Sequence, residues 1–131
     1  MADQIVMVDT SILIDYFRKK DKSKTRLFTL SQRFDSLCIS SITAFEIYTS
    51  AKAEQVEFWK TMLANFILIP FDSDTAIVAV EIKAKLKKTR KSIDIADLFI
   101  AATAITHNLV FDTLNQKHFE IIEDLKLLKS V

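Results

Sequence analysis

The sequence predicts an α/β fold in which a central, mostly parallel five-stranded sheet is flanked by helices. Short apolar runs rich in β-branched residues alternate with longer segments of helical periodicity, which is typical of a parallel sheet covered on both faces. The chain has 131 residues, half of them hydrophobic and 27% charged, so we expect one domain over residues 1–131. It contains no glycine, which excludes the glycine-rich phosphate loops of nucleotide-binding proteins.

Five apolar runs are the expected strands. In chain order they are residues 5–8, 37–40, 66–69, 109–111 and 120–122. The third run ends at Pro70, the only proline, because proline cannot donate a hydrogen bond to a neighbouring strand.

The helices between these runs have readable starts. Ser11 is expected to cap a helix that reaches Phe17. Thr43 and Glu46 have the spacing of a capping box, in which each side chain accepts a hydrogen bond from a free amide of the first turn.

The later helices are predicted in the same way. Asp72 or Ser73 is expected to cap one helix, and Asp94 to cap another over residues 95–107. Asn108 then supplies a left-handed C-terminal turn, a conformation that asparagine tolerates better than most residues.

The helix predicted over residues 75–87 is apolar on two sides. One row can face the sheet, and the other would then need a partner, which predicts a homodimer. The rows are Ile77, Val80 and Ala84, and Val78, Ile82 and Leu86.

Acidic residues fall where a strand ends or a helix begins. Asp9 and Asp112 directly follow expected strands, Glu46 follows another by one turn, and Asp97 lies in the first turn of a helix. Because the carboxyl ends of parallel strands form the ligand crevice of an open sheet, these carboxylates should converge there. Clustered carboxylates favour a hard cation with oxygen ligands, such as Mg²⁺ or Mn²⁺.

Each acid also has a purely structural interpretation. Glu46 could only close its capping box, and Asp97 could only complement the helix dipole. Asp9 could be a turn residue, and Asp112 a solvated acid in a loop.

Two further features concern the cellular compartment and the membrane. Cys38 is the only cysteine, so no disulfide can form within one chain and a reducing compartment, the cytoplasm, is expected. No apolar run approaches the ~20 residues that a membrane-spanning helix needs, so no membrane partner is expected.

Four segments resemble the motifs of PIN-domain ribonucleases. They are VDTSILID at residues 8–15, SSITAFEI at 40–47, DLFIAATA at 97–104 and TLNQKHF at 113–119. Their order and spacing cover the whole chain. A chain with this one domain is most similar to the VapC-type toxins of toxin–antitoxin pairs.

The resemblance implies a metal-dependent endoribonuclease that works with Mg²⁺, or Mn²⁺ in its place. It also implies RNA as substrate, a cognate antitoxin and a homodimer. The family's acids correspond to Asp9, Glu46 and Asp97, its fourth polar position to Asn115, and its hydroxyl to Thr113.

Asp112 departs from the family pattern, in which a small or apolar residue usually precedes the threonine. The fourth ligand is therefore Asn115, Asp112 or both.

Hydrolysis of a phosphodiester needs an activated water and neutralised charge, and one or two bound ions supply both. Asp9 and Asp97 would bind the first ion, while Glu46 would bind a second ion or orient the water. Asn115 and Thr113 would hold water or phosphate by hydrogen bonds.

Basic residues supply the expected RNA contacts. Twelve of the 18 lie in two windows, residues 18–26 and 83–91, which are either solvated helix ends or phosphate-binding surfaces. In the second window, four residues just before Asp97 are expected to bind RNA: Lys87, Lys88, Arg90 and Lys91.

The alternative function is a non-catalytic PIN-like module that binds RNA or protein. The three acids argue against it, since a binder of a polyanion gains nothing from them. An aspartyl phosphatase is disfavoured because Asp9 is followed by Thr10 and Ser11, without the second aspartate of an Asp-x-Asp motif.

Overall fold

The computed structural model describes residues 5–129, which form one five-stranded sheet with the order β3-β2-β1-β4-β5. All four neighbouring pairs are parallel, which confirms the predicted α/β architecture. The strands are β1 (Ile5–Val8), β2 (Ser36–Ser40), β3 (Ile67–Ile69), β4 (Val110–Asp112) and β5 (Lys126–Leu127).

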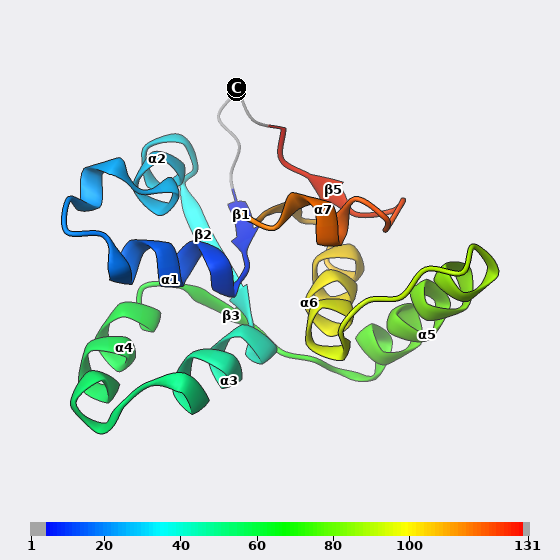
Figure 1. The fold of residues 1–131 in the computed structure, drawn as a ribbon, viewed down its shortest axis with the longest axis horizontal. Coiled ribbons are helices and arrows are strands. Elements are labelled where there is room, and N and C mark those ends of the chain that lie inside the picture. Colours follow the sequence, from blue (N-terminus) through cyan, green and yellow to red (C-terminus); the bar gives the residue numbers. More distant parts are fainter. Residues whose placement is uncertain (1–4, 130–131) are drawn as a thin grey trace.

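Seven α-helices and two short 3₁₀ helices within the described residues connect these strands (Figure 1). The α-helices are α1 (Thr10–Arg18), α2 (Arg26–Arg33), α3 (Ser41–Ser50), α4 (Val56–Leu63), α5 (Ser73–Lys88), α6 (Ile95–Thr106) and α7 (Gln116–Phe119). The 3₁₀ helices are η1 (Lys22–Lys24) and η2 (Ala53–Gln55).

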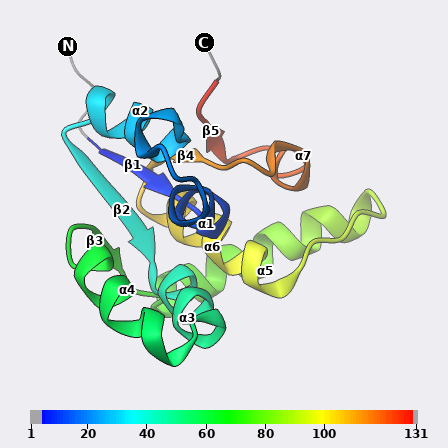
Figure 2. The same cartoon turned by 60° about the vertical axis from the view of Figure 1, so that its left-hand side comes forward.

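The helices cover both faces of the sheet. The helices α1 to α4 pack on one face, and α5, α6 and α7 lie on the other (Figure 1). Figure 2 shows α3 and α4 near β2 and β3, and α7 with β5 at the other side of the sheet. No helix in residues 5–129 combines the length and the apolar character that crossing a bilayer would require.

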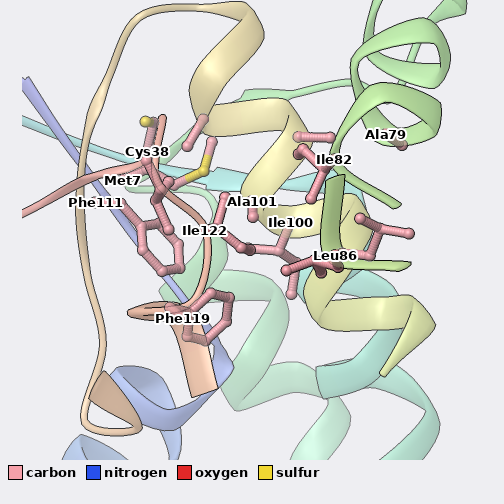
Figure 3. Packing of buried hydrophobic residues seen from close by; sticks show 14 residues of the cluster. Met7, Cys38, Ala79, Ile82, Leu86, Ile100, Ala101, Phe111, Phe119 and Ile122 are labelled. Atoms are coloured by element: carbon pink, nitrogen blue, oxygen red, sulfur yellow. The ribbon is translucent and has the colours of Figure 1, made fainter. Parts of the chain in front are cut away.

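Alternation along β1 divides the core into two clusters. Val6 and Val8 belong to the cluster under α1 to α4, whereas Met7 between them belongs to the cluster under α6. In the second cluster, alanines of α6 such as Ala101 let the helix approach the sheet closely, and Ile82 and Leu86 of α5 pack on its outer side (Figure 3). The helix α5 therefore contacts mainly α6, rather than the sheet as predicted.

The prediction of a fifth strand at residues 120–122 is wrong. Glu120 ends α7, the chain then makes successive turns, and the fifth strand forms at Lys126–Leu127. Phe119, Ile122 and Leu125 recur every three residues, which is the spacing of turns, and all three are buried. These residues are apolar because their side chains pack in the core, so the run does not indicate an extended backbone.

Two predicted helix caps are also wrong, because both helices begin earlier than expected. The side chain of Asp9, rather than that of Ser11, caps α1 by accepting a hydrogen bond from the Ser11 amide. Ser40 caps α3 by accepting from two backbone amides, so Thr43 lies inside the helix and no capping box with Glu46 forms.

The caps predicted for the later helices fare better. Asp72 caps α5, with its carboxylate accepting a hydrogen bond from the Thr75 amide. Asp94 occupies the N-cap position of α6 without a side-chain bond. Asn108 has a positive φ of 55°, as the left-handed turn requires.

Candidate active site

An open pocket of about 700 Å³ brings together three of the predicted acids. Asp9 enters it from the end of β1, Glu46 from α3, and Asp97 from the first turn of α6. Asp94, the N-cap residue of α6, lines it as well. We call this the acid pocket, and its lining residues are Asp9, Thr10, Ser11, Ile14, Asp15, Arg18, Lys19, Glu46, Asp94, Asp97, Leu114, Asn115 and His118.

Asp9 is held by hydrogen bonds to both of its carboxylate oxygens. The Ser11 hydroxyl donates to Oδ1 at 2.6 Å, and the Thr113 hydroxyl donates to Oδ2 at 2.7 Å. The residue is only 3% exposed. Burial raises the pKa of Asp9 above its usual value, and the hydrogen bonds from Ser11 and Thr113 oppose this rise.

Glu46 is positioned from across the pocket. The Thr10 hydroxyl donates to its Oε1 at 2.6 Å, which ties α3 to the first residue of α1. This contact takes the place of the capping box predicted for Glu46. Thr10 is therefore a positioning residue that the sequence analysis missed, although a hydroxyl directly after Asp9 was visible in the motif.

Asp97 carries the clearest electrostatic signature of the site. Partial burial raises its pKa to about 6, and the negative charges of Asp9, Glu46 and Asp94 add to the effect. His118 opposes it, with Nδ1 lying 3.8 Å from Asp97 Oδ2. The pocket thus gathers negative charge that the surrounding protein leaves incompletely neutralised.

The donor set fits a hard divalent ion that keeps part of its water shell. Among the residues with described positions, no three acidic, histidine or cysteine side chains are arranged to hold one ion together. Magnesium commonly uses only one or two carboxylates and completes its octahedron with water and substrate phosphate. An open pocket with separated carboxylates suits that mode of binding.

The two polar residues after β4 have different placements. Asn115 lines the acid pocket, whereas Thr113 is 2% exposed and is absent from its lining. The Thr113 hydroxyl donates to Asp9 and accepts a hydrogen bond from the Asn115 amide at 2.9 Å. Thr113 therefore positions Asp9 and the following loop.

Asp112 does not join the pocket. The residue is 1% exposed, and its carboxylate accepts a hydrogen bond from Arg26 Nε at 2.6 Å. This ion pair satisfies the buried carboxylate and uses one cation of the window at residues 18–26. Of the two candidates for the fourth site residue, Asn115 is the one that lines the pocket.

The residues predicted to bind RNA lie at different places in the structure. Lys91 lines a second pocket that adjoins the acid pocket, whereas Lys88 lines a third cavity farther along α5. Lys87 and Arg90 line none of these three. Arg18 and Lys19, at the end of α1, line the acid pocket itself.

Comparisons with known proteins agree with this geometry. The PIN domain family matches residues 6–124. The chain is 39% identical to Ribonuclease VapC1 of Methanocaldococcus jannaschii over 126 residues, which cover 93% of this chain and 84% of that protein.

Two solved structures extend the similarity to the fold. VapBC2 from Rickettsia felis, bound to a DNA fragment from its promoter, superimposes with a TM-score of 0.80 at 27% identity, covering 98% of this chain and 100% of the other. A toxin–antitoxin complex from Klebsiella pneumoniae gives a TM-score of 0.76 at 29% identity, covering 95% and 96%.

The matched family spans nearly all of the strands and helices, and it includes all three acids of the pocket. A relative well above 30% identity covers most of both chains. The chain therefore belongs to the PIN-domain family, among the VapC ribonucleases.

Proposed function

We propose that the acid pocket is the active site of a metal-dependent endoribonuclease, the toxin of a toxin–antitoxin pair. The observation that carries this is the convergence of Asp9, Glu46 and Asp97 in one open pocket of a VapC-family chain. The raised pKa of Asp97 supports it, since closely placed carboxylates are costly unless a cation offsets their charge.

Mg²⁺ is the ion we propose, with Mn²⁺ able to replace it. Asp9 and Asp97 would hold it, and Glu46 would hold a second ion or orient the attacking water. When bound, the ion supplies a nucleophilic water at neutral pH and offsets charge on the phosphate.

The remaining side chains would fix the geometry of the reaction. Ser11 and Thr113 keep both oxygens of Asp9 oriented, and Thr10 keeps Glu46 turned toward the pocket. Asn115 lines the acid pocket and would donate a hydrogen bond to a phosphate oxygen. Positioning of this kind matters because small displacements of catalytic groups cost much of the rate.

We also propose a protein antitoxin as partner and the cytoplasm as compartment. The related Klebsiella pneumoniae structure is described as a toxin–antitoxin complex, and an RNA-cutting protein needs such control in the compartment that holds RNA. An antitoxin that places an arginine or lysine beside the acids would offset their charge in the way a metal ion does.

The test is cleavage of single-stranded RNA by the purified chain. We expect cleavage with Mg²⁺ or Mn²⁺, none with EDTA, and none by an Asp9→Asn variant that folds normally. Asp35→Asn makes the same chemical change at an exposed turn before β2 and should retain activity. RNA binding without cleavage under any metal condition would instead support a non-catalytic binding module.

A further inference from the structure

The acid pocket continues into a second pocket on the side of α7. This side pocket, of about 530 Å³, is lined by Lys91, Ser92, Ile93, Asp94, Asp97, Lys117, His118 and Ile121. The two pockets share Asp94, Asp97 and His118, so they form one groove that crosses the acids from the end of α1 to the loop before α6.

Basic side chains line both ends of this groove. Arg18 is exposed at the end of α1 and lines the acid pocket. Its neighbour Lys19 is partly compensated, because its Nζ lies 3.0 Å from a carboxylate oxygen of Asp15. At the other end, Lys91 and Lys117 are both exposed and face the same side pocket.

The position of Lys91 follows from a tight turn at the end of α5. Arg90 has a positive φ of 58°, its amide donates to the Lys87 carbonyl at 3.1 Å, and the Lys91 amide donates to the Leu86 carbonyl at 2.9 Å. These are the two hydrogen bonds of a Schellman motif. The turn reverses the chain after α5 and brings Lys91, but not Lys87 or Lys88, to the groove.

A third cavity beyond Lys91 has a different charge balance. It is lined by Lys85, Lys88 and Lys91 but also by Glu120, Glu123 and Asp124. Lys85 Nζ lies 2.8 Å from an Asp124 carboxylate oxygen. Because acids there offset the lysines, a phosphate would gain little in this cavity, and the favourable path for a polyanion ends at Lys91.

We propose that this groove is the path of a single RNA strand across the active site. Arg18 binds backbone phosphate on one side of the scissile bond, and Lys91 and Lys117 bind it on the other. This path rests on the proposed ribonuclease function. It limits the expected phosphate-binding residues to Arg18, Lys91 and Lys117. Flanking cations are needed because the acid pocket is lined by five carboxylates, which repel RNA.

The test compares two double variants with the same change in net charge. Lys91→Gln with Lys117→Gln removes the two groove cations, whereas Lys87→Gln with Lys88→Gln removes two lysines at the end of α5 outside the groove. Affinity for a labelled single-stranded RNA is measured at several salt concentrations, with Asp9→Asn in every protein to prevent cleavage.

We expect the groove pair to weaken binding by roughly tenfold at low salt. It should also flatten the slope of log affinity against log salt by about 1.4, the value for two phosphate contacts on a single strand. The control pair should leave the slope within about 0.3 of the parent value, since phosphate contacts rather than net charge determine the slope.

A second measurement locates the contacts along the RNA. Oligonucleotides are shortened stepwise from the 5′ or the 3′ side of the cut. In one of the two series, loss of the nucleotides that reach the side pocket should abolish the difference between the groove pair and its parent.

Equal slopes for the two pairs, or a groove-pair effect that survives both series, would overturn the assigned path. In that case metal-dependent cleavage by the unmodified protein would still stand as evidence for the proposed function. If the unmodified protein neither binds nor cleaves RNA, the proposed function fails together with the path.

Discussion

Asp97 is the residue at which burial, charge and the proposed chemistry meet. Its carboxylate is raised in pKa to about 6 by partial burial and by three neighbouring acids. The shift means that the folded, metal-free protein binds this proton more tightly than the unfolded chain does. Above about pH 6 the ionised carboxylate therefore destabilises the fold, and as pH falls from about 6 toward 4 that penalty disappears.

We expect Asp97→Asn to abolish RNA cleavage and to stabilise the metal-free protein. The full pKa shift corresponds to about 3 kcal/mol, and solvent screening at a partly exposed side chain reduces the expected gain to about 1 kcal/mol. The free energy of unfolding, measured with EDTA, should exceed that of the parent at pH 7.5. The two proteins should converge near pH 4.

If Asp97 is a metal ligand, added metal should make the parent more stable than Asp97→Asn. Saturating Mn²⁺ should stabilise the parent by linkage but leave Asp97→Asn nearly unchanged. The exposed Asp35→Asn serves as control and should follow the parent at every pH. A lower stability of Asp97→Asn than of the parent at pH 7.5 with EDTA would contradict this account.

The placement of single acids could be predicted only where it follows from chain direction. Asp9 and Asp97 adjoin element ends that must meet at the same edge of a parallel sheet, so their convergence was predictable. The pairing of Asp112 with Arg26 was not, since it joins residues 86 positions apart in sequence. No local sequence pattern indicates which of two acids near a strand end will form an ion pair with a basic side chain.

At the scale of elements, the first four apolar runs predicted their strands and the fifth did not. Strand β5 has only two residues and its burial is partial, so its sequence carries almost no signal. The starts of α1 and α3 were predicted too late for a related reason. Asp9 directly follows β1 and caps α1, and Ser40 is the last residue of β2 and caps α3. A pattern that expects a loop between strand and helix therefore places the cap too late.

Two helices end in left-handed turns without glycine. Arg90 after α5 and Asn108 after α6 have φ values of 58° and 55°. In both turns the amides of two successive residues donate to carbonyls of the last turn of the helix. Asparagine adopts this conformation at little cost, whereas a long side chain such as arginine costs about 1 kcal/mol.

We expect Arg90→Gly to raise the free energy of unfolding by up to about 1 kcal/mol, because glycine removes the steric penalty of the left-handed turn. Asn108→Gly should change it by only a few tenths of a kcal/mol. Chemical denaturation measures both. Arg90→Ala controls for the lost charge and should be no more stable than the parent. If Arg90→Ala gained as much as Arg90→Gly, charge rather than backbone conformation would be the cause.

At the scale of the whole molecule, the fold leaves an apolar surface of α5 uncovered. Of the two rows on α5, Ile82 and Leu86 are buried, as one row was predicted to be, but they pack against α6 rather than against the sheet. On the other row, Ile77 and Val80 are 60% and 68% exposed. They lie one turn apart on the same helix, so they form a continuous apolar strip that is exposed to solvent in the isolated chain.

This strip supports the predicted homodimer, in which α5 of one copy would pack on a second copy. We expect the purified chain to have about twice the 15.0 kDa mass of one chain in light scattering at micromolar concentration. Ile77→Lys with Val80→Lys should give a monomer, because two buried, unpaired ammonium groups would cost far more than the strip gains. Gln32→Lys with Thr61→Lys adds the same charge at exposed polar positions on α2 and α4 and should remain dimeric. A monomeric parent, or a dimer that survives both lysines on α5, would show that this surface does not join two copies.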